Sequence, residues 1–349
     1  MTVSRFCCRM ALPILCLFSM PQALRAQDAA MHSDRSRVEV LAIPVPELAP
    51  DGLRVRVLLP DGYDPKSQIG YPVLYLNDGQ DAEAVALQAT LKALIHDGVI
   101  RPLIAVAIDM PRDRMGAYGY SDRAHKRSLV APLRVGAIGA HAHAYSEWVA
   151  TRLVPAIDAK YRTRAHADAR AVLGWSLGAA NALNLGWQYP EVFAVVGAFS
   201  PSLWLSPKPD EVAGIQASRF AQSMIAAGAY HPGSRFFFAV GDTEETDDRD
   251  GDGVIDVLDD ARDLIDGWRM AGDAQPRAKG LRQLGHSVNL DHAATAMREV
   301  QIAFASGEVQ INSGVSCLRH VWSGQSSPSR ISVAEKYGSC LRHLSTCVC

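Results

Sequence analysis

The residues Ala171-Val172-Leu173-Gly174-Trp175-Ser176-Leu177-Gly178-Ala179-Ala180-Asn181-Ala182-Leu183 decide how this chain of 349 residues folds. A short apolar run, typical of a buried strand, leads into a glycine-flanked serine, and small helix-forming residues follow. A turn this tight strains the backbone of its central serine, and any side chain at the two glycines would clash. The stretch therefore predicts a strand, a sharp turn with Ser176 at its apex, and a helix whose N-terminus points at the serine.

Ser176 is the candidate nucleophile. A serine hydroxyl is almost fully protonated at neutral pH, so it needs a general base. In this strand–turn–helix setting, an acid and then a histidine follow the serine along the chain. His286 fits, because it follows Gly285 and lies between a strand candidate and the last helical stretch. The N–H of Leu177, at the start of the helix, is the expected donor to an oxyanion.

The rest of the chain alternates short apolar runs with helical stretches from about residue 37. Such alternation is typical of βαβ units, so we predict an α/β fold with a mostly parallel sheet covered by helices on both faces. The predicted strands are 38–45, 53–59, 72–76, 103–108, 171–173, 192–198 and 236–240. The predicted helices are 82–96, 145–161, 179–188, 209–226, 257–271 and 292–305.

The composition is that of one large globular domain. Hydrophobic residues make up 48% and charged residues 21% of the chain, and the formal net charge is −2. Basic residues are scattered and form no stripe, so nucleic acid is not an expected partner. No segment after the N-terminus is long and apolar enough to be a membrane span.

The N-terminus has the pattern of a secretory signal peptide. Arg5 and Arg9 precede an apolar stretch over residues 10–20, and small Ala26 ends a plausible cleavage site. We therefore interpret residues 1–26 as a signal peptide and residues 27–306 as the catalytic domain. The protein is expected to be exported, either to the periplasm or to the medium.

The C-terminal residues 307–349 are rich in Ser and Gly, and we interpret them as a disordered tail. Two C-x-x-H pairs within it, Cys317 with His320 and Cys340 with His343, are an alternative zinc-ligand set. The body of the chain has no cysteine between Ala26 and Ser316, so it must be stabilised by its core without disulfides.

Residues 248–259 have the ligand spacing of a calcium loop. Carboxylates occupy loop positions 1, 3, 5, 9 and 12, and a glycine at position 6 allows the sharp turn. So many carboxylates repel one another without a cation, so we expect a structural calcium ion; the alternative is a solvated acidic loop. The predicted ligands are Asp248, Asp250, Asp252, the Val254 carbonyl, Asp256 and Asp259.

Taken together, residues 71–305 resemble the putative-esterase family of α/β-hydrolases, which includes enterochelin-esterase-like, feruloyl-esterase-like and S-formylglutathione-hydrolase-like enzymes. The resemblance rests on residues 71–80 (YPVLYLNDGQ), the turn 174–178, residues 198–204 (AFSPSLW) and residues 285–287 (GHS). It implies the α/β-hydrolase fold and a serine esterase that needs no cofactor for catalysis.

The resemblance also implies the third member of a catalytic triad. It places the acid just after the predicted strand 236–240, at Glu244. Asp242, Glu245 and Asp247 lie in the same stretch and remain rivals.

The second oxyanion donor is implied at the N–H of Gly79 or Gln80, where a glycine lets the backbone approach the substrate. One departure from the family pattern is Ala117, because many relatives carry an acidic residue near that position, after an arginine like Arg114. Substrate contacts of those relatives therefore do not transfer to this chain.

The predicted function is an exported serine carboxylic-ester hydrolase that works through an acyl-enzyme on a small-molecule or saccharide ester, such as a siderophore or cell-wall ester. One alternative is an acyltransferase of the same fold. Another is a non-catalytic, calcium-dependent binding protein on a hydrolase scaffold. Trp148, Trp175 and Trp204 are candidates for stacking on a substrate ring, and core packing explains them equally well.

Overall fold

The computed structural model describes residues 37–46, 48–134, 136–228, 231–241, 244–270 and 278–284. The predicted signal peptide, His286, the rival acid Asp242, the predicted helix 292–305 and the tail with its two C-x-x-H pairs lie outside these residues. Within the described residues, no helix is both long and apolar enough to cross a membrane.

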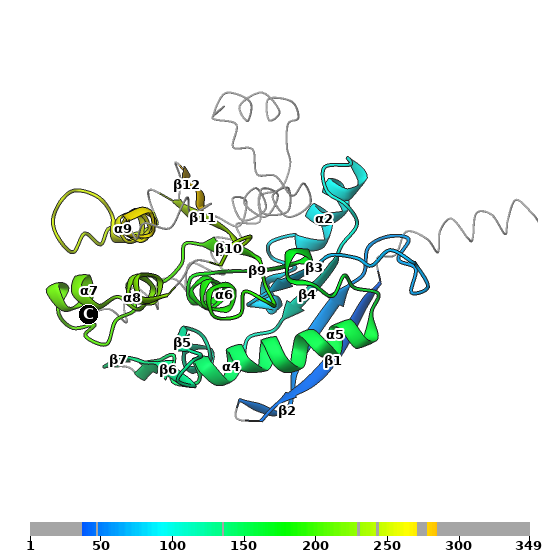
Figure 1. The fold of residues 1–349 in the computed structure, drawn as a ribbon, viewed down its shortest axis with the longest axis horizontal. Coiled ribbons are helices and arrows are strands. Elements are labelled where there is room, and N and C mark those ends of the chain that lie inside the picture. Colours follow the sequence, from blue (N-terminus) through cyan, green and yellow to red (C-terminus); the bar gives the residue numbers. More distant parts are fainter. Residues whose placement is uncertain are drawn as a thin grey trace, which may run out of the picture.

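The described residues form a central sheet of eight strands, in the order β1-β2-β4-β3-β9-β10-β11-β12 (Figure 1). Strands from β4 to β12 run parallel, and the β1–β2 hairpin joins them in antiparallel fashion at one edge. This confirms the predicted α/β-hydrolase fold. The strands are β1 (Val38–Val45), β2 (Ala49–Leu58), β3 (Val73–Leu76), β4 (Ile104–Ile108), β9 (Arg170–Trp175), β10 (Val195–Phe199), β11 (Arg235–Gly241) and β12 (Ala278–Leu284).

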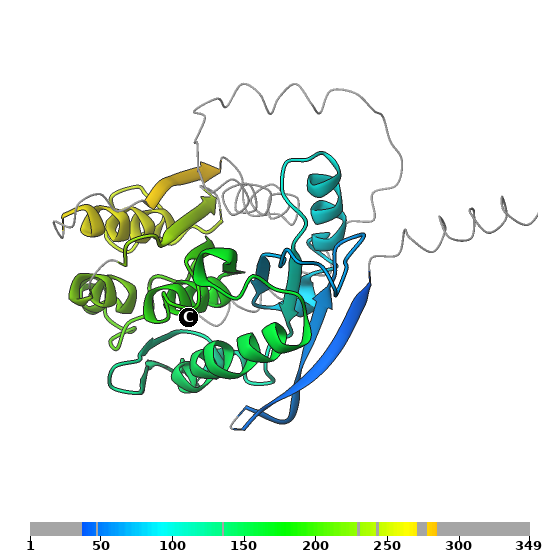
Figure 2. The same ribbon diagram turned by 45° about the vertical axis from the view of Figure 1, so that its right-hand side comes forward.

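Helices cover both faces of this sheet (Figure 2). On one face, α2 (Leu87–His96) packs over the strands. The helices that contribute to the core on the other face are α4 (Ala142–Trp148), which continues through a π-helical turn (Val149–Leu153) into α5 (Val154–Lys160), then α6 (Leu177–Gln188), α8 (Phe220–Ala227) and α9 (Asp256–Met270).

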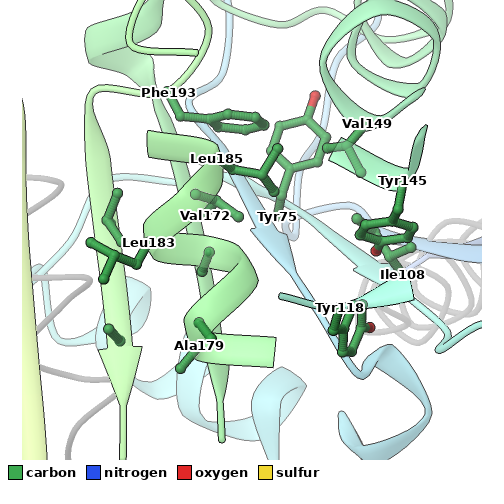
Figure 3. Close-up of a cluster of buried hydrophobic side chains, with 14 of the residues drawn as sticks. Tyr75, Ile108, Tyr118, Tyr145, Val149, Val172, Ala179, Leu183, Leu185 and Phe193 are labelled. Atoms are coloured by element: carbon green, nitrogen blue, oxygen red, sulfur yellow. The ribbon is translucent and has the colours of Figure 1, made fainter. Parts of the chain in front are cut away.

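The larger core lies between the sheet and α6. Side chains from β3, β9 and α6, among them Tyr75, Val172 and Leu183, meet there with Phe193 (Figure 3). Helix α6 is buried on all sides from Leu177 to Gly186, which fits its small and apolar composition. The helix that begins at Ser176 is thus held rigidly at the centre of the fold.

Two predicted helices differ from the structure in their extent, and short hairpins occur where none was predicted. The predicted helix 209–226 is two helices, α7 (Val212–Ser218) and α8, because the extended backbone of Arg219 separates them. The predicted helix 82–96 begins later, at Leu87, and a short 3-10 helix (Gly79–Asp81) precedes it. Two small hairpins, which the sequence did not predict, follow α3 (Arg114–Ala117): β5 (Tyr120–Asp122) with β6 (Arg127–Leu129), and β7 (Ala131–Leu133) with β8 (Gly136–Ile138).

Candidate active site

Ser176 lies at the apex of the turn between β9 and α6, as predicted. Its backbone has φ 54° and ψ −124°, in the left-handed half of the map that side chains other than glycine rarely adopt. It is the N-cap of α6, yet its side chain makes no capping hydrogen bond. Its Oγ lies 3.5 Å from the Oγ of Ser202. Ser176 is half-buried, and its hydroxyl is not used to cap the helix that follows it.

The two glycines of the turn are required for different reasons. A Cβ on Gly174 would lie 2.5 Å from the backbone carbonyl group of Gly178, so it would break the turn itself. A Cβ on Gly178 would lie 2.6 Å from Oδ2 of Asp78, which belongs to the loop after β3. The second glycine therefore makes room for a neighbouring loop as well as for its own turn.

That neighbouring loop comprises residues 77–80, and it holds Gly79 and Gln80, the two candidates for the second predicted oxyanion donor. The Asn77 side chain donates to the carbonyl of Gly178 at 2.9 Å and to Asn181 at 3.1 Å. Oδ1 of Asn77 accepts a hydrogen bond of 3.0 Å from the Tyr145 hydroxyl. Because these groups are buried, the 77–80 loop is fixed against the start of α6 by a fully satisfied polar network.

Gly79 and Gln80 follow at the start of the 3-10 helix. A Cβ on Gly79 would lie 2.5 Å from the backbone of Ala107 in β4, so only glycine fits there. The Gly79 carbonyl accepts a hydrogen bond from Arg56, and the Gln80 side chain accepts from the N–H of Met110 at 2.9 Å. The structure thus brings Ser176 and Leu177 close to Gly79 and Gln80, at the carboxyl ends of the adjacent strands β9 and β3.

Asp78 connects the 77–80 loop to α3. Its backbone is left-handed, with φ 55°, and its side chain is 1% exposed. Arg114 binds the carboxylate with two hydrogen bonds, both of 2.8 Å. The N–H of Asp78 donates to the hydroxyl of Tyr118 at 3.0 Å. The pairing of Asp78 with Arg114 is not predicted by the sequence, because the two residues lie 36 positions apart along the chain.

Glu244 lies just beyond β11, among the loops at the carboxyl ends of the parallel strands. Its Oε1 accepts a hydrogen bond of 2.6 Å from the Ser200 hydroxyl and another from the N–H of Gly241. Ser200 follows β10 and has φ 43°. Burial raises the pKa of Glu244, and the two hydrogen bonds oppose that rise without cancelling it.

The rival acids that the structure describes make other contacts. Glu245 is exposed and accepts from the N–H of Val257 at 2.7 Å, at the start of α9. Asp247 is exposed as well, and its backbone carbonyl accepts from Asp256.

Two of the tryptophans are structural. Trp148 is 3% exposed, and its indole N–H donates to the carbonyl of Pro44 at 2.9 Å. Trp175 is partly buried and packs against the core under α2. Trp204 is partly buried against the larger core. Core packing therefore accounts for Trp148 and Trp175.

The acidic loop 248–259 brings together three of its predicted ligands. Carboxylate oxygens of Asp248, Asp250 and Asp252 lie within 4.8 Å of one another. Asp248 also accepts from the N–H groups of Gly251 and Gly253, at 2.8 and 3.0 Å, and Gly253 has φ 87°, as the sharp turn requires. Asp248 thus closes the first half of the loop through hydrogen bonds to its backbone.

The last two predicted carboxylate ligands lie outside that group. Asp256 accepts from the backbone N–H of Arg249 at 2.8 Å and pairs with its guanidinium at 3.2 Å. Burial and the charges of Asp263, Asp250 and Asp252 raise the pKa of Asp259. Asp259 is therefore electrostatically coupled to the cluster without belonging to it.

Comparison with known proteins identifies the family. The family model described as "Putative esterase" matches residues 49–271, which is more than half of the chain. The chain belongs to this esterase family. The family's description places it among carboxylic-ester hydrolases, which agrees with the predicted class of enzyme.

A curated relative of this esterase-family protein is an endo-1,4-beta-xylanase/feruloyl esterase from Xylanibacter ruminicola. The two are 29% identical over 174 residues, which cover 47% of this chain and 21% of the relative. The chain therefore matches only about a fifth of that larger protein.

Solved structures similar to this esterase-family protein have the same fold. A ferulic acid esterase has a TM-score of 0.56 at 20% identity, covering 78% of this chain and 98% of its own. The enterobactin esterase FES from Shigella flexneri has a TM-score of 0.55 at 18% identity, covering 78% of this chain and 60% of its own. An IroE-like serine hydrolase from Shewanella oneidensis has a TM-score of 0.55 at 20% identity, covering 79% of this chain and 82% of its own. At these identities the likeness extends to the fold alone.

Proposed function

We propose that this protein is a serine carboxylic-ester hydrolase that works through an acyl-enzyme. The Ser176 hydroxyl gives its proton to His286 while its oxygen attacks the ester carbonyl carbon. The oxyanion accepts hydrogen bonds from the N–H of Leu177 and from that of Gly79 or Gln80. The alcohol leaves with the proton from His286, and water then releases the acid by the same steps.

The backbone of Ser176 is the observation that carries this proposal. Strain at a non-glycine residue persists only where the surrounding structure enforces it, and such residues cluster at functional sites. Leu177 starts α6, and the first N–H groups of a helix have no acceptor within the helix. The helix N-terminus also favours the negative charge that forms at this point.

The contacts of Glu244 support its assignment as the triad acid. Ser200 and Gly241 bind one carboxylate oxygen of Glu244, which leaves the other for a histidine. Glu244 also lies in the loop that follows β11, and Ser200 lies in the loop after β10, the strand next to β9. Among the described residues, the exposed Glu245 and Asp247 instead contact Val257 and Asp256 at the start of α9.

The named relatives suggest the substrate class. One carries a feruloyl esterase, one is a ferulic acid esterase, and one is an esterase of the siderophore enterobactin. We propose an ester of an aromatic acid, joined to a saccharide or within a siderophore, as the substrate. The alternatives of an acyltransferase and of a non-catalytic binding protein predict, respectively, a stable acyl-enzyme and no turnover.

The test is ester hydrolysis by the full chain and by Ser176→Ala and Ser202→Ala variants. The substrates are p-nitrophenyl acetate, methyl ferulate and a catechoyl-serine ester. We expect Ser176→Ala to lose about 10⁴-fold or more in kcat. A fluorophosphonate should label the parent and the Ser202→Ala variant but not Ser176→Ala; both serines lie in one tryptic peptide, so the variants assign the label. A folded parent with neither turnover nor label would refute the esterase mechanism.

We propose, as a separate point, that the acidic loop 248–259 binds calcium in a structural role. The three clustered carboxylates are hard oxygen donors of the kind calcium prefers, and the turn at Gly253 is in place. Calcium should therefore raise the Tm of the full chain, and Asp250→Asn should reduce that shift. Equal Tm values in calcium and in a chelator would contradict the proposal.

We propose further that the protein is exported, on the strength of the charged and apolar pattern of residues 1–26. Expression of the full chain in a bacterial host should yield a mature form that begins after Ala26, as N-terminal sequencing can determine. Retention of Met1 in a cytoplasmic fraction would contradict export.

A further inference from the structure

Two acidic side chains, one in the 77–80 loop and one directly after it, lie beside the site where negative charge develops during ester hydrolysis. Asp78 is 1% exposed, and Asp81 follows in the 3-10 helix. Burial and the charge of Asp78 raise the pKa of Asp81. An uncompensated buried carboxylate at this place would repel an oxyanion held by the same loop. The loop therefore needs a cation to serve as an oxyanion site.

Arg114 supplies that cation in a fixed geometry. Its Nε and Nη2 donate to the two oxygens of Asp78, both at 2.8 Å, which is the bidentate pairing that only a guanidinium can make. The guanidinium lies 5.3 Å from the centroid of the Tyr118 ring, and Tyr118 accepts the N–H of Asp78. Arg114 and Tyr118 thus hold both the side chain and the backbone of Asp78.

The first residue of α3 is itself held in place. Asp113 caps this short helix by accepting from the N–H of Gly116 at 2.9 Å. The carbonyls of Met115 and Gly116 accept from the N–H groups of Gly139 and His141, at 2.8 and 2.7 Å. The segment that carries Arg114 is therefore hydrogen-bonded to the residues that precede α4. From this fixed segment, Arg114 can hold the 77–80 loop in place relative to α6.

We propose that Arg114 is a positioning residue for the reaction: its guanidinium neutralises Asp78 and holds the 77–80 loop against Gly178, so that the N–H groups of the loop face the oxyanion. This inference rests on the proposed esterase function. Arg114 acts through Asp78 and does not itself need to touch the substrate.

The test compares Arg114→Met with Arg170→Met in the full chain. Arg170 is a matched control, because it pairs with Asp158 at 2.5 Å, is also mostly buried, and lies at the opposite end of β9 from Ser176. We expect Arg114→Met to lower kcat about 10- to 100-fold with little change in KM, as for a displaced oxyanion donor. Arg170→Met should lower Tm and leave kcat unchanged.

A double variant separates charge neutralisation from a loss of packing. Arg114→Met together with Asp78→Asn removes both charges, so it should recover part of the kcat that Arg114→Met loses. A mere structural defect would give additive losses instead. A rise in KM with kcat unchanged would overturn the proposal, because it would make Arg114 a substrate contact.

Hydrogen exchange tests the same inference without turnover. Amides of residues 78–82 should exchange faster in Arg114→Met than in the parent, and Arg170→Met should leave them unchanged. If the parent hydrolyses no ester but these amides still exchange faster in Arg114→Met than in the parent, the positioning role of Arg114 would be upheld and the esterase function refuted. Unchanged exchange in Arg114→Met would overturn the positioning role alone.

Discussion

The second glycine of the turn, Gly178, has close neighbours on the side of the 77–80 loop as well as in its own turn. Asn77 binds its carbonyl, and a Cβ there would lie 2.6 Å from Oδ2 of Asp78. The glycine pattern around Ser176 therefore encodes a tertiary contact in addition to a local backbone requirement. Substitutions at these residues should affect catalysis and stability differently.

Gly178→Ala should lower kcat by about 10- to 100-fold, because its methyl group would displace Asp78 and with it the loop of oxyanion donors. Steady-state kinetics on a p-nitrophenyl ester would measure the loss. Gly186→Ala is the matched control in the same helix: its Cβ would meet the Val196 side chain, so Tm should fall while kcat stays unchanged. Equal kcat losses in both variants would contradict this reasoning.

Glu244→Gln should change the pH dependence of stability. Burial raises the pKa of Glu244 above 4.5, so the folded state binds this proton more tightly than the unfolded chain does. The resulting stabilisation is complete below pH 4.5 and is lost as the pH rises through the raised pKa. Glutamine cannot ionise, so between pH 4 and about 8 the free energy of unfolding should fall less in Glu244→Gln than in the parent. Urea titrations at several pH values would measure this difference.

The same variant tests the triad acid. Glu244→Gln should lose about 10³- to 10⁴-fold in kcat, because it no longer stabilises the charged histidine. Glu245→Gln, at an exposed neighbour, should retain the parent kcat. Loss of activity in Glu245→Gln with activity retained in Glu244→Gln would move the acid to the rival residue.

Among the secondary-structure elements, the sequence predicts the buried strands well and misses the shortest strands. The buried strands β3, β4, β9, β10 and β11 were found because each is a continuous apolar run between turn signals. The hairpins β5–β6 and β7–β8 have strands of three residues, too short to display an alternating pattern.

The break between α7 and α8 depends on a distant charge. Arg219 leaves the helical conformation at the junction, and its guanidinium binds Asp260 and Asp263 in α9. No local breaker residue marks this position, so the sequence predicted one continuous helix. The Arg114–Asp78 pair escaped prediction for the same reason, whereas Ser176 was found because its requirement for two glycines is local.

Asp260→Asn should lower the free energy of unfolding by about 3–5 kcal/mol, since it leaves the buried guanidinium of Arg219 without its closest partner. The measurement is equilibrium unfolding in urea. Asp263→Asn removes the other partner, whose side chain is 47% exposed, and should cost about 0–1 kcal/mol. Similar costs for the two substitutions would show that burial does not set the strength of this pair.

The described part of the chain contains two hydrophobic cores on opposite faces of one sheet. Leu183 in α6 belongs to the larger core, and Leu173 in β9 belongs to the core under α2. Both are fully buried, and β9 has side chains in each core. The sheet should therefore couple the two cores into one cooperative unit.

Leu173→Ala and Leu183→Ala should each lower the free energy of unfolding by about 2–5 kcal/mol in a single transition. Circular dichroism and tryptophan fluorescence should report the same midpoint. Val40→Ala, at a side chain 56% exposed on β1, should change stability by about 0.5 kcal/mol or less. Separate midpoints for the two probes would indicate that the cores unfold independently.

The adjacent strands β3, β9, β10 and β11 each deliver one part of the site: the 77–80 loop, Ser176, Ser200 and Glu244. The loops that carry these parts contact one another, because Asn77 binds the carbonyl of Gly178 and the Ser200 hydroxyl binds Glu244. Loop lengths are tolerated thermodynamically far better than changes in the core. A library that varies contacting loops together would therefore sample new acyl and alcohol groups while the sheet stays constant.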